Sequence, residues 1–170
     1  KDLPLQFICC QADNIPITSS TIDKVRFDRV LQHISEHDKA LKEVARILKQ
    51  NGVLQIIDTD YLSCSLFLED ELLEWKIIDT VAYKKIPNGH KIRKLPSTLI
   101  QNNFTLTTTE IHNYIINDFE FANYIIRFDN LIKEEFGNGN VTEKQLYLWQ
   151  QGKSNFHFSL NLVIYQATKN

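Results

Sequence analysis

The stretch Leu31–Val44, LQHISEHDKALKEV, contains a string that could bind zinc. HISEH, residues 33–37, fits the H-x-x-E-H pattern of one class of zinc peptidases. Two histidines bind one zinc ion when they project from the same helical face, with a third ligand elsewhere. Ser35 can cap a helix, which would begin after His33. His33 and His37 would then not share a face, so we predict that the string binds no zinc.

Carboxylates at the ends of expected strands form a second candidate group. Asp13 follows the apolar run FICCQA, and Asp58 and Asp60 follow VLQII. In open α/β sheets, ligands bind outside the carboxyl ends of the parallel strands, so these acids fit a polar binding site. Asp is also common wherever strands turn into loops. Position alone favours neither explanation.

The five glycines form no phosphate-binding loop. Such loops usually follow G-x-G-x-x-G or G-x-x-x-x-G-K-[ST] between a strand and a helix. The nearest arrangement, GNGN at Gly137, follows an expected helix and is better explained as a helix stop. No G-x-S-x-G motif supports a catalytic serine, and the aromatic residues have core spacing rather than that of a nucleic-acid stacking platform.

The composition is that of an ordinary globular domain. The 170 residues are 43% hydrophobic and 24% charged, enough for one domain with a core. A net charge of -2 and a pI of 6.2 do not support binding to nucleic acid or to an anionic membrane. No apolar run reaches the ~18–20 residues that span a bilayer. Cys9, Cys10 and Cys64 lack C-x-x-C spacing, which indicates a reducing, cytoplasmic compartment, and Cys9 and Cys10 are predicted to be free core thiols.

Hydrophobic patterns predict the elements that position these residues. Apolar runs predict strands at Phe7–Cys10, Lys24–Phe27 and Val53–Ile57. An amphipathic helix is expected over Glu36–Lys49, ended by Asn51-Gly52. Strands alternating with amphipathic helices favour an α/β fold with a mostly parallel sheet.

The second half of the chain continues with further helices and strands. Helical segments are expected at about Leu66–Ile86 and at Leu95–Gln101. Apolar residues recur at helical spacing in FEFANYIIRFDNLIKEEFG, and a Thr142-x-x-Gln145 capping box predicts the start of another helix. The Thr-rich FTLTTTEIHNYII and the alternating FHFSLNLVIY predict two more strands.

Between Ala12 and Asp60, short motifs follow one another in a characteristic order. They are Asp13-Asn14-Ile15-Pro16, Thr21-Ile22-Asp23, Leu31-Gln32-His33, Glu43-x-x-Arg46-Ile47-Leu48-Lys49-Gln50-Asn51-Gly52, and a strand ending in Asp58. This series resembles the second half of the core of class I S-adenosylmethionine-dependent methyltransferases, especially the small-molecule group that includes quinone-biosynthesis enzymes. The later NGHKIRKLPSTLIQNNF is similar to the stretch before the sixth strand of that family.

The resemblance implies a single methyltransferase-like domain over residues 1–170. It would contain the third to seventh strands of a seven-stranded Rossmann-like sheet, the last of them antiparallel. The first two strands and the glycine-rich loop would lie upstream of Lys1, so the sheet is expected to be incomplete and the chain alone inactive. The expected partners are a small-molecule substrate and either a missing N-terminal segment or a second copy that completes the sheet.

The resemblance also implies a function and site residues. The function is methyl transfer from S-adenosyl-L-methionine to a small molecule; a non-catalytic remnant that serves as a binding or oligomerisation module is the alternative. Asp13 would accept a hydrogen bond from the adenine amino group, and the N–H of Asn14 or Ile15 would serve a ring nitrogen. The remaining candidates are Phe27, Asp28 and Arg29 near the sulfonium, and His33, Asp58, Asp60 and Tyr61 on the substrate side. His33 could act as a base toward an ionisable O–H or N–H.

Overall fold

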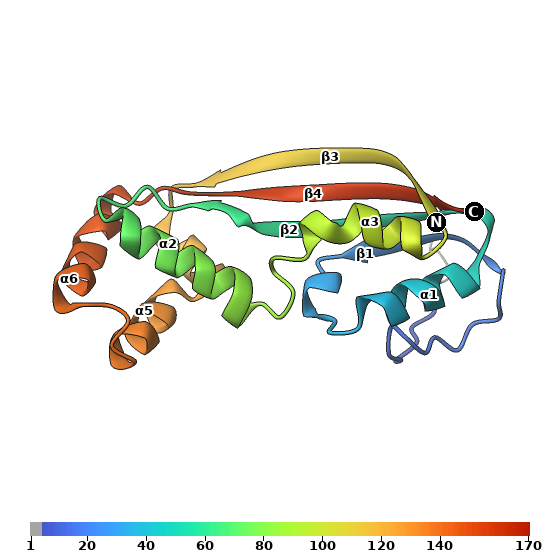
Figure 1. Ribbon diagram of the computed structural model, residues 1–170, viewed down its shortest axis with the longest axis horizontal. Helices are drawn as coiled ribbons and strands as arrows, with labels where there is room; N and C mark the ends of the chain where they lie inside the picture. Colours follow the sequence, from blue (N-terminus) through green and yellow to red (C-terminus); the bar gives the residue numbers. More distant parts are fainter. Residues whose placement is uncertain (1–4) are drawn as a thin grey trace.

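The structure, a computed structural model, describes residues 5–170. Its sheet has four strands in the order β1-β2-β4-β3. β1 (Ile22–Asp28) runs parallel to β2 (Leu48–Ser65), whereas β4 (Phe158–Lys169) is antiparallel to β2 and to β3 (Phe104–Ile116). The sheet extends along the longest axis of the molecule (Figure 1). The α/β fold and the antiparallel last strand are therefore as predicted.

Two groups of helices lie beside the two halves of the sheet (Figure 1). One group is α1 (His37–Ile47) and α3 (Leu95–Gln101). The other consists of α2 (Glu71–Asp79), α4 (Phe119–Ile126), α5 (Phe128–Gly137) and α6 (Glu143–Gly152). Short helical turns complete the chain: η1 (Leu31–His33), η2 (Thr80–Lys85), η3 (Ile92–Lys94) and η4 (Lys153–Asn155). Within residues 5–170, no helix is both long enough and apolar enough to cross a membrane.

The strand predicted at Phe7–Cys10 is wrong. These residues adopt no regular secondary structure, and Phe7 is 93% exposed. Cys9 and Cys10 are exposed as well, which contradicts their prediction as core thiols. A strand needs a neighbour for its N–H and C=O groups, and β1 lies at the edge of the sheet without pairing to this segment. Within residues 5–170 the sheet therefore has four strands, not the five expected, and the missing one is the strand expected at Phe7–Cys10.

The other early elements are confirmed with shifted ends. Lys24–Phe27 and Val53–Ile57 fall within β1 and β2. The helix predicted over Glu36–Lys49 begins one residue later and ends two residues earlier. Its N-cap is Glu36, which makes no side-chain capping bond, so the prediction of Ser35 as the cap is wrong.

The C-terminal half largely follows the predicted pattern. The first expected helix there begins later, at α2, where Asp70 caps it, and it continues into the wider turn η2. The expected helical segment after Asp118 is divided in two by Arg127, whose φ is 65°. The capping box formed by Thr142 and Gln145 is present at the start of α6.

Two hydrophobic clusters hold these elements together. In the first, α1 and α3 pack through residues such as Leu41 and Leu99 on one face of the sheet, where they meet Leu54. In the second, α2, α4 and α5 pack with α6 through residues that include the buried Trp149 of α6. The 18-residue strand β2 contributes to both clusters, through Leu54 to the first and through Tyr61 to the second.

Candidate functional site

A groove of about 1090 Å³ opens at the carboxyl end of β1 and beside the middle of β2. Alternate residues of a strand face opposite sides of a sheet, so Ile57, Thr59 and Tyr61 of β2 reach the groove together. Its polar end is formed by these two strands and by η1, and its apolar end by β3, β4 and α4. The position agrees with the general placement of ligand sites at strand carboxyl ends.

The polar end contains one carboxylate that two arginines share. Asp28 Oδ2 lies 2.7 Å from Arg26 Nη2, and its Oδ1 lies 3.1 Å from Arg29 Nε. Arg29 has a φ of 54°, an unusual backbone conformation for a residue other than glycine. Its N–H donates to the carbonyl oxygen of Ile57 over 2.7 Å, which fixes the end of β1 against β2. The predicted residues Asp28 and Arg29 therefore both line the groove.

His33 and Tyr61 also line the groove, as neighbours of Gln32. The Gln32 side-chain amide donates to His33 Nε2 over 3.0 Å. This bond occupies the lone pair that a general base would use, so His33 can accept a proton at Nε2 only when the amide turns away. Burial raises the pKa of Tyr61, which keeps its phenol protonated at neutral pH.

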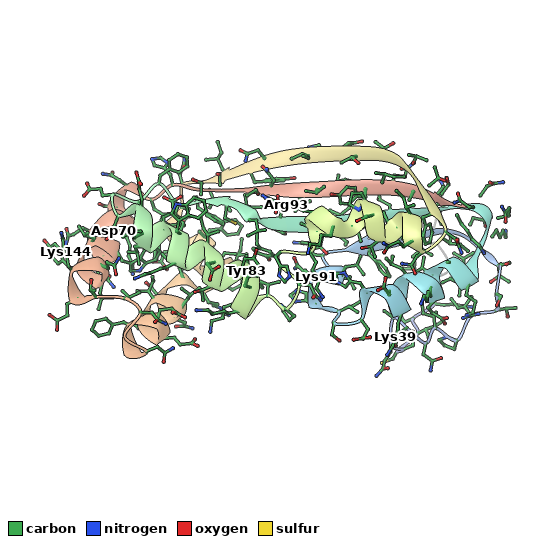
Figure 2. All side chains as sticks on the ribbon, in the orientation of Figure 1. Lys39, Asp70, Tyr83, Lys91, Arg93 and Lys144 are labelled. Atoms are coloured by element: carbon green, nitrogen blue, oxygen red, sulfur yellow. The ribbon has the colours of Figure 1, made fainter. Side chains whose placement is uncertain are left out.

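Asp58 and Asp60 lie on the opposite face of β2 from the groove, with Leu54 and Ile56. Asp58 is 2% exposed and accepts hydrogen bonds from the N–H groups of Gln32 and Thr59, each over 3.0 Å. Burial raises the pKa of its carboxyl. Asp60 accepts both of its side-chain bonds from Nε of Arg93, at 3.0 and 2.9 Å (Figure 2 labels this arginine). Both acids thus have partners inside the protein, and neither lines the groove.

The predicted adenine-binding residues lie on a loop that is tied to α1. The N–H of Asn14 donates to the Gln11 carbonyl oxygen over 3.1 Å, and the N–H of Ile15 donates to Glu43 Oε1 over 2.8 Å. Both amides named for the adenine ring are therefore already used. The Asp13 side chain is exposed.

Glu43 and Arg46 are the anchor of this loop. Arg46 donates to Glu43 and also to the carbonyl oxygens of Ile15 and Ile17, at 2.9 and 2.8 Å. The hydrogen bonds from Arg46 and from the Ile15 N–H lower the pKa of Glu43 from 4.5 to about 2.

Acid is expected to release this loop only at very low pH. Because the folded-state pKa of Glu43 is lower than 4.5, its stabilising contribution is complete above that pH and disappears as the pH falls through about 2. The amide chemical shift of Ile15 should therefore titrate with a midpoint near 2 in NMR spectra. Glu43→Gln should abolish that titration, whereas Glu36→Gln, at the exposed start of α1, should not affect it. A midpoint near 4.5 would contradict the assignment.

Phe27 is a cofactor candidate that lies away from the groove. Its side chain is buried in the first hydrophobic cluster, on the side covered by α1 and α3. The structure thus brings Asp28, Arg29, His33 and Tyr61 to one groove and leaves the other predicted residues outside its lining.

Several groove residues were missed by the sequence argument. Arg26 could have been found from the period-2 alternation of β1, which places it on the same face as Asp28. Gln32 lies between Leu31 and His33 of a motif, and no sequence pattern indicates that its own side chain lines the groove. Phe121 and Ile125 of α4 were interpreted only as helical spacing, and no sequence pattern indicates that they face the carboxyl ends of distant strands.

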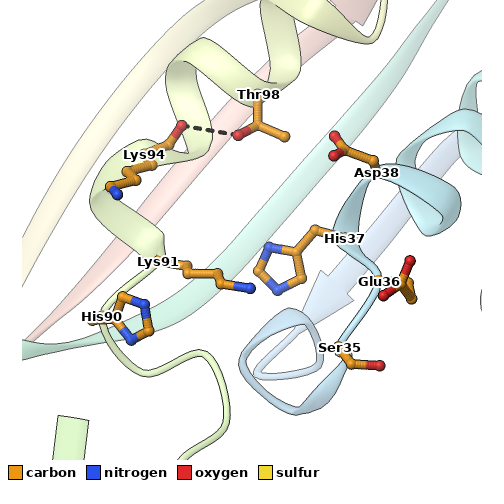
Figure 3. A pocket seen from close by; sticks show the side chains of 8 residues that line it. All are labelled: Ser35, Glu36, His37, Asp38, His90, Lys91, Lys94 and Thr98. Carbon is orange, nitrogen blue, oxygen red and sulfur yellow. Dashed lines mark hydrogen bonds between the residues drawn. The ribbon is translucent and has the colours of Figure 1, made fainter. Parts of the chain in front are cut away.

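A second cavity, of about 310 Å³, lies between the start of α1 and the segment 90–98 (Figure 3). His37 and Lys91 point toward one another there. Burial lowers the pKa of His37, and the nearby ammonium of Lys91 lowers it further, so the ring is neutral at pH 7. His37 Nε2 lies 2.6 Å from the Leu31 carbonyl oxygen and donates to it. His37 is thus partly buried and engaged rather than solvated.

The zinc string is divided between two elements. His33 belongs to η1 and His37 begins α1, and each ring has its own partner within the chain. In the part of the chain that the structure describes, no three His, Cys, Asp or Glu side chains are grouped as metal ligands. That HISEH binds no zinc stays a prediction.

Residues 1–56 match the family described as "Methyltransferase domain". A 37.1 kDa uncharacterized protein of transposon TN4556 from Streptomyces fradiae is 27% identical over 112 residues, which are 66% of this chain and 32% of that protein. UbiE of Campylobacter jejuni, a ubiquinone/menaquinone biosynthesis C-methyltransferase, is 32% identical over 54 residues, 32% of this chain and 23% of UbiE. The chain thus spans less than a third of these relatives.

Solved structures show the same fold. A proposed methyltransferase from Bacillus halodurans superposes with a TM-score of 0.65 at 14% identity, covering 97% of this chain and 78% of the other. The YcgJ protein from Bacillus subtilis has a TM-score of 0.62 at 16% identity, with 95% of this chain and 69% of the other covered. The chain therefore has a Rossmann-like fold shared with a protein assigned as a methyltransferase.

Proposed function

We propose that the methyltransferase-domain sequence of residues 1–56 reflects a shared chemistry, and that this protein transfers a methyl group from S-adenosyl-L-methionine to a small-molecule acceptor. One observation supports the proposal most. The matched segment contains β1 and five of the residues that line the polar end of the groove, namely Arg26, Asp28, Arg29, Gln32 and His33.

The fit of the chain to the cofactor is partial. Asp13 is exposed, so its carboxylate can accept from an adenine amino group, but the neighbouring amides of Asn14 and Ile15 already donate within the chain. At the end of β1, Asp28 is paired with two arginines, so the local charge is positive and does not favour a sulfonium. When bound, the cofactor supplies an electrophilic methyl group.

In this proposal the groove residues orient the acceptor and accept its proton. Displacement at a methyl group requires in-line approach, so orientation supplies much of the rate. Thr59 and Tyr61 offer hydroxyl groups at the polar end. His33 Nε2 takes the acceptor proton once the Gln32 amide has turned away, and the acceptor oxygen or nitrogen then carries the electron pair that attacks. On the other face of β2, Asp58 accepts a hydrogen bond from the Gln32 N–H and Asp60 from Arg93, and these bonds hold the strand in place.

A further segment, or a second copy, completes the sheet at β1 in this proposal. β1 lies at the edge of the sheet, and an unpaired strand edge exposes N–H and C=O groups that pair readily with another strand. The two structural relatives extend beyond the region that this chain covers, which is 78% and 69% of their lengths.

Cofactor binding measured by calorimetry tests the proposal. Asp13 offers adenine one charge-assisted hydrogen bond, worth about 1.5–3 kcal/mol, whereas a micromolar complex requires ~8 kcal/mol. The 170-residue chain is therefore expected to bind S-adenosylmethionine more weakly than micromolar. A form extended at its N-terminus by the strand and glycine-rich loop of this domain type is expected to bind it.

Substitution of Asp13 sharpens this test. In the extended form, Asp13→Ala should weaken binding by about tenfold or more. Asp23→Ala, which removes an exposed carboxylate from β1, should change the affinity little. Unchanged affinity in Asp13→Ala would refute the adenine assignment, and failure of the extended form to bind would refute the cofactor.

A second candidate function is a binding or oligomerisation module. The edge strand β3 favours it, since Ile111, Tyr114 and Ile115 are 64%, 51% and 68% exposed. Sedimentation equilibrium distinguishes the two functions. Stable dimers, combined with absence of cofactor binding in the extended form, would support the module.

A further inference from the structure

We infer that the methyl acceptor is an amphipathic oxyanion: a small molecule with an apolar body and, at one end, a carboxylate or a hydroxyl group that ionises when His33 takes its proton. The inference rests on the proposed function, because it assigns the groove to the acceptor of that reaction. Its basis is the separation of the groove into an apolar part and a cationic part.

The apolar part is formed by side chains from three elements. It is lined by Leu162 and Ile164 of β4, Tyr114 of β3, and Phe121 and Ile125 of α4. Phe121 and Ile125 are spaced i, i+4 on α4 and are 53% and 49% exposed. An aromatic or branched hydrocarbon body would remove this apolar surface from water.

The cationic part lies where the reaction is expected. Asp28 is the carboxylate that faces the two guanidinium groups of Arg26 and Arg29, so one positive charge is left unbalanced. Around it, His33, Thr59 and Tyr61 offer an imidazole and two hydroxyl groups. An oxyanion gains from this arrangement, whereas an ammonium head would be repelled.

The size of the groove agrees with a small-molecule ligand. Pockets for such molecules usually measure roughly 300–1,000 Å³. The groove, at about 1090 Å³, lies near the upper end of that range. The cationic end meets the carboxyl end of β1, and the acceptor body would extend away from it toward α4.

Three probes test the inference on the complete 170-residue chain. 1-Naphthoate has both an apolar body and a carboxylate, 1-naphthalenemethanol has the body without the charge, and acetate has the charge without the body. In NMR titrations, 1-naphthoate is expected to bind at least about tenfold more tightly than either of the others. Equal affinity for naphthoate and the alcohol would overturn the assignment of an anionic head.

Matched variants locate the binding. Phe121→Ser should weaken naphthoate binding by about fivefold or more, whereas Tyr124→Ser, at a 72% exposed position of α4 outside the groove lining, should not. Arg29→Gln should weaken binding of naphthoate but not of the alcohol. Lys24→Gln, on β1 outside the groove lining, should affect neither. Equal effects of Phe121→Ser and Tyr124→Ser, or no effect of either, would mean non-specific adsorption and would refute the inference.

This readout is independent of the cofactor. If the extended form binds S-adenosylmethionine but 1-naphthoate does not bind, the methyl-transfer proposal survives and the acceptor class is wrong. If naphthoate binds as the variants predict and the cofactor does not, the groove is an oxyanion-binding site and the methyl-transfer assignment fails, together with the role of the groove as an acceptor site.

Discussion

Replacing Trp149 with alanine is expected to lower the free energy of unfolding by about 3–5 kcal/mol. Trp149 is 1% exposed, and its ring centroid lies 5.8, 5.9 and 6.5 Å from those of Phe119, Phe128 and Phe156. Its Nε1 also donates to Asp129 over 3.0 Å. The variant would lose dispersion contacts, leave a cavity among three aromatic rings and remove a donor from a partly buried acid.

The other tryptophan of the chain is the control for this prediction. Trp75 lies on α2 and is 67% exposed, so Trp75→Ala should cost less than about 1 kcal/mol. Urea denaturation followed by circular dichroism measures both variants. Similar midpoints for the two would show that the aromatic cluster does not hold α4, α5 and α6 on the sheet. Trp149→Phe, which keeps most of the ring volume, should fall between the two alanine variants.

Arg93→Ala is expected to cost about 2–3 kcal/mol, because it leaves the Asp60 carboxylate buried without its partner. The Asp60 side chain is 10% exposed, whereas that of Arg93 is 52% exposed. Water already reaches the guanidinium and would partly replace it, so the cost lies toward the lower end of values for broken buried pairs.

A double variant separates the lost pair from lost packing. If the unpaired charge causes the loss, Arg93→Ala combined with Asp60→Asn should recover about half or more of the stability, since a neutral amide is cheaper to bury than a carboxylate. Urea denaturation of the four proteins of this cycle gives the coupling energy. Additive effects of the two substitutions would show that the side chains do not interact.

Most of the regular elements could be predicted from local patterns. β1, β2 and α1 follow from apolar runs and a 3.6-residue stripe, and the capping box at Thr142 follows from two side chains three residues apart. Phe7–Cys10 has an equally good apolar run and yet is not a strand, because the run says nothing about whether a pairing partner is present. Arg127 separates α4 from α5 by adopting a left-handed backbone conformation. Glycine is the usual residue for that conformation, so the break could not be predicted from an arginine.

The site could be predicted only in part, because side-chain direction depends on the strand as a whole. The sequence places Asp58, Asp60 and Tyr61 at the end of a strand, but all three were expected to face the substrate. In the structure, the two acids bond to η1 and to Arg93 on one face, while Tyr61 lines the groove on the other. The apolar end of the groove depends on α4 and β3, which are distant in sequence from β1, so no local spacing could indicate it.

The alternation of side chains along β2 has a consequence for how this protein can change. Leu54, Ile56 and Asp58 lie on the helix-covered side, whereas Ile57, Thr59 and Tyr61 line the groove on the other side. Inserting or deleting one residue within Val53–Asp60 would exchange the two sets, placing carboxylates in the groove and groove residues in the core. Substitutions alter one side at a time, whereas a change in length alters both. The length of this segment is therefore more strongly constrained than the identity of any single residue within it.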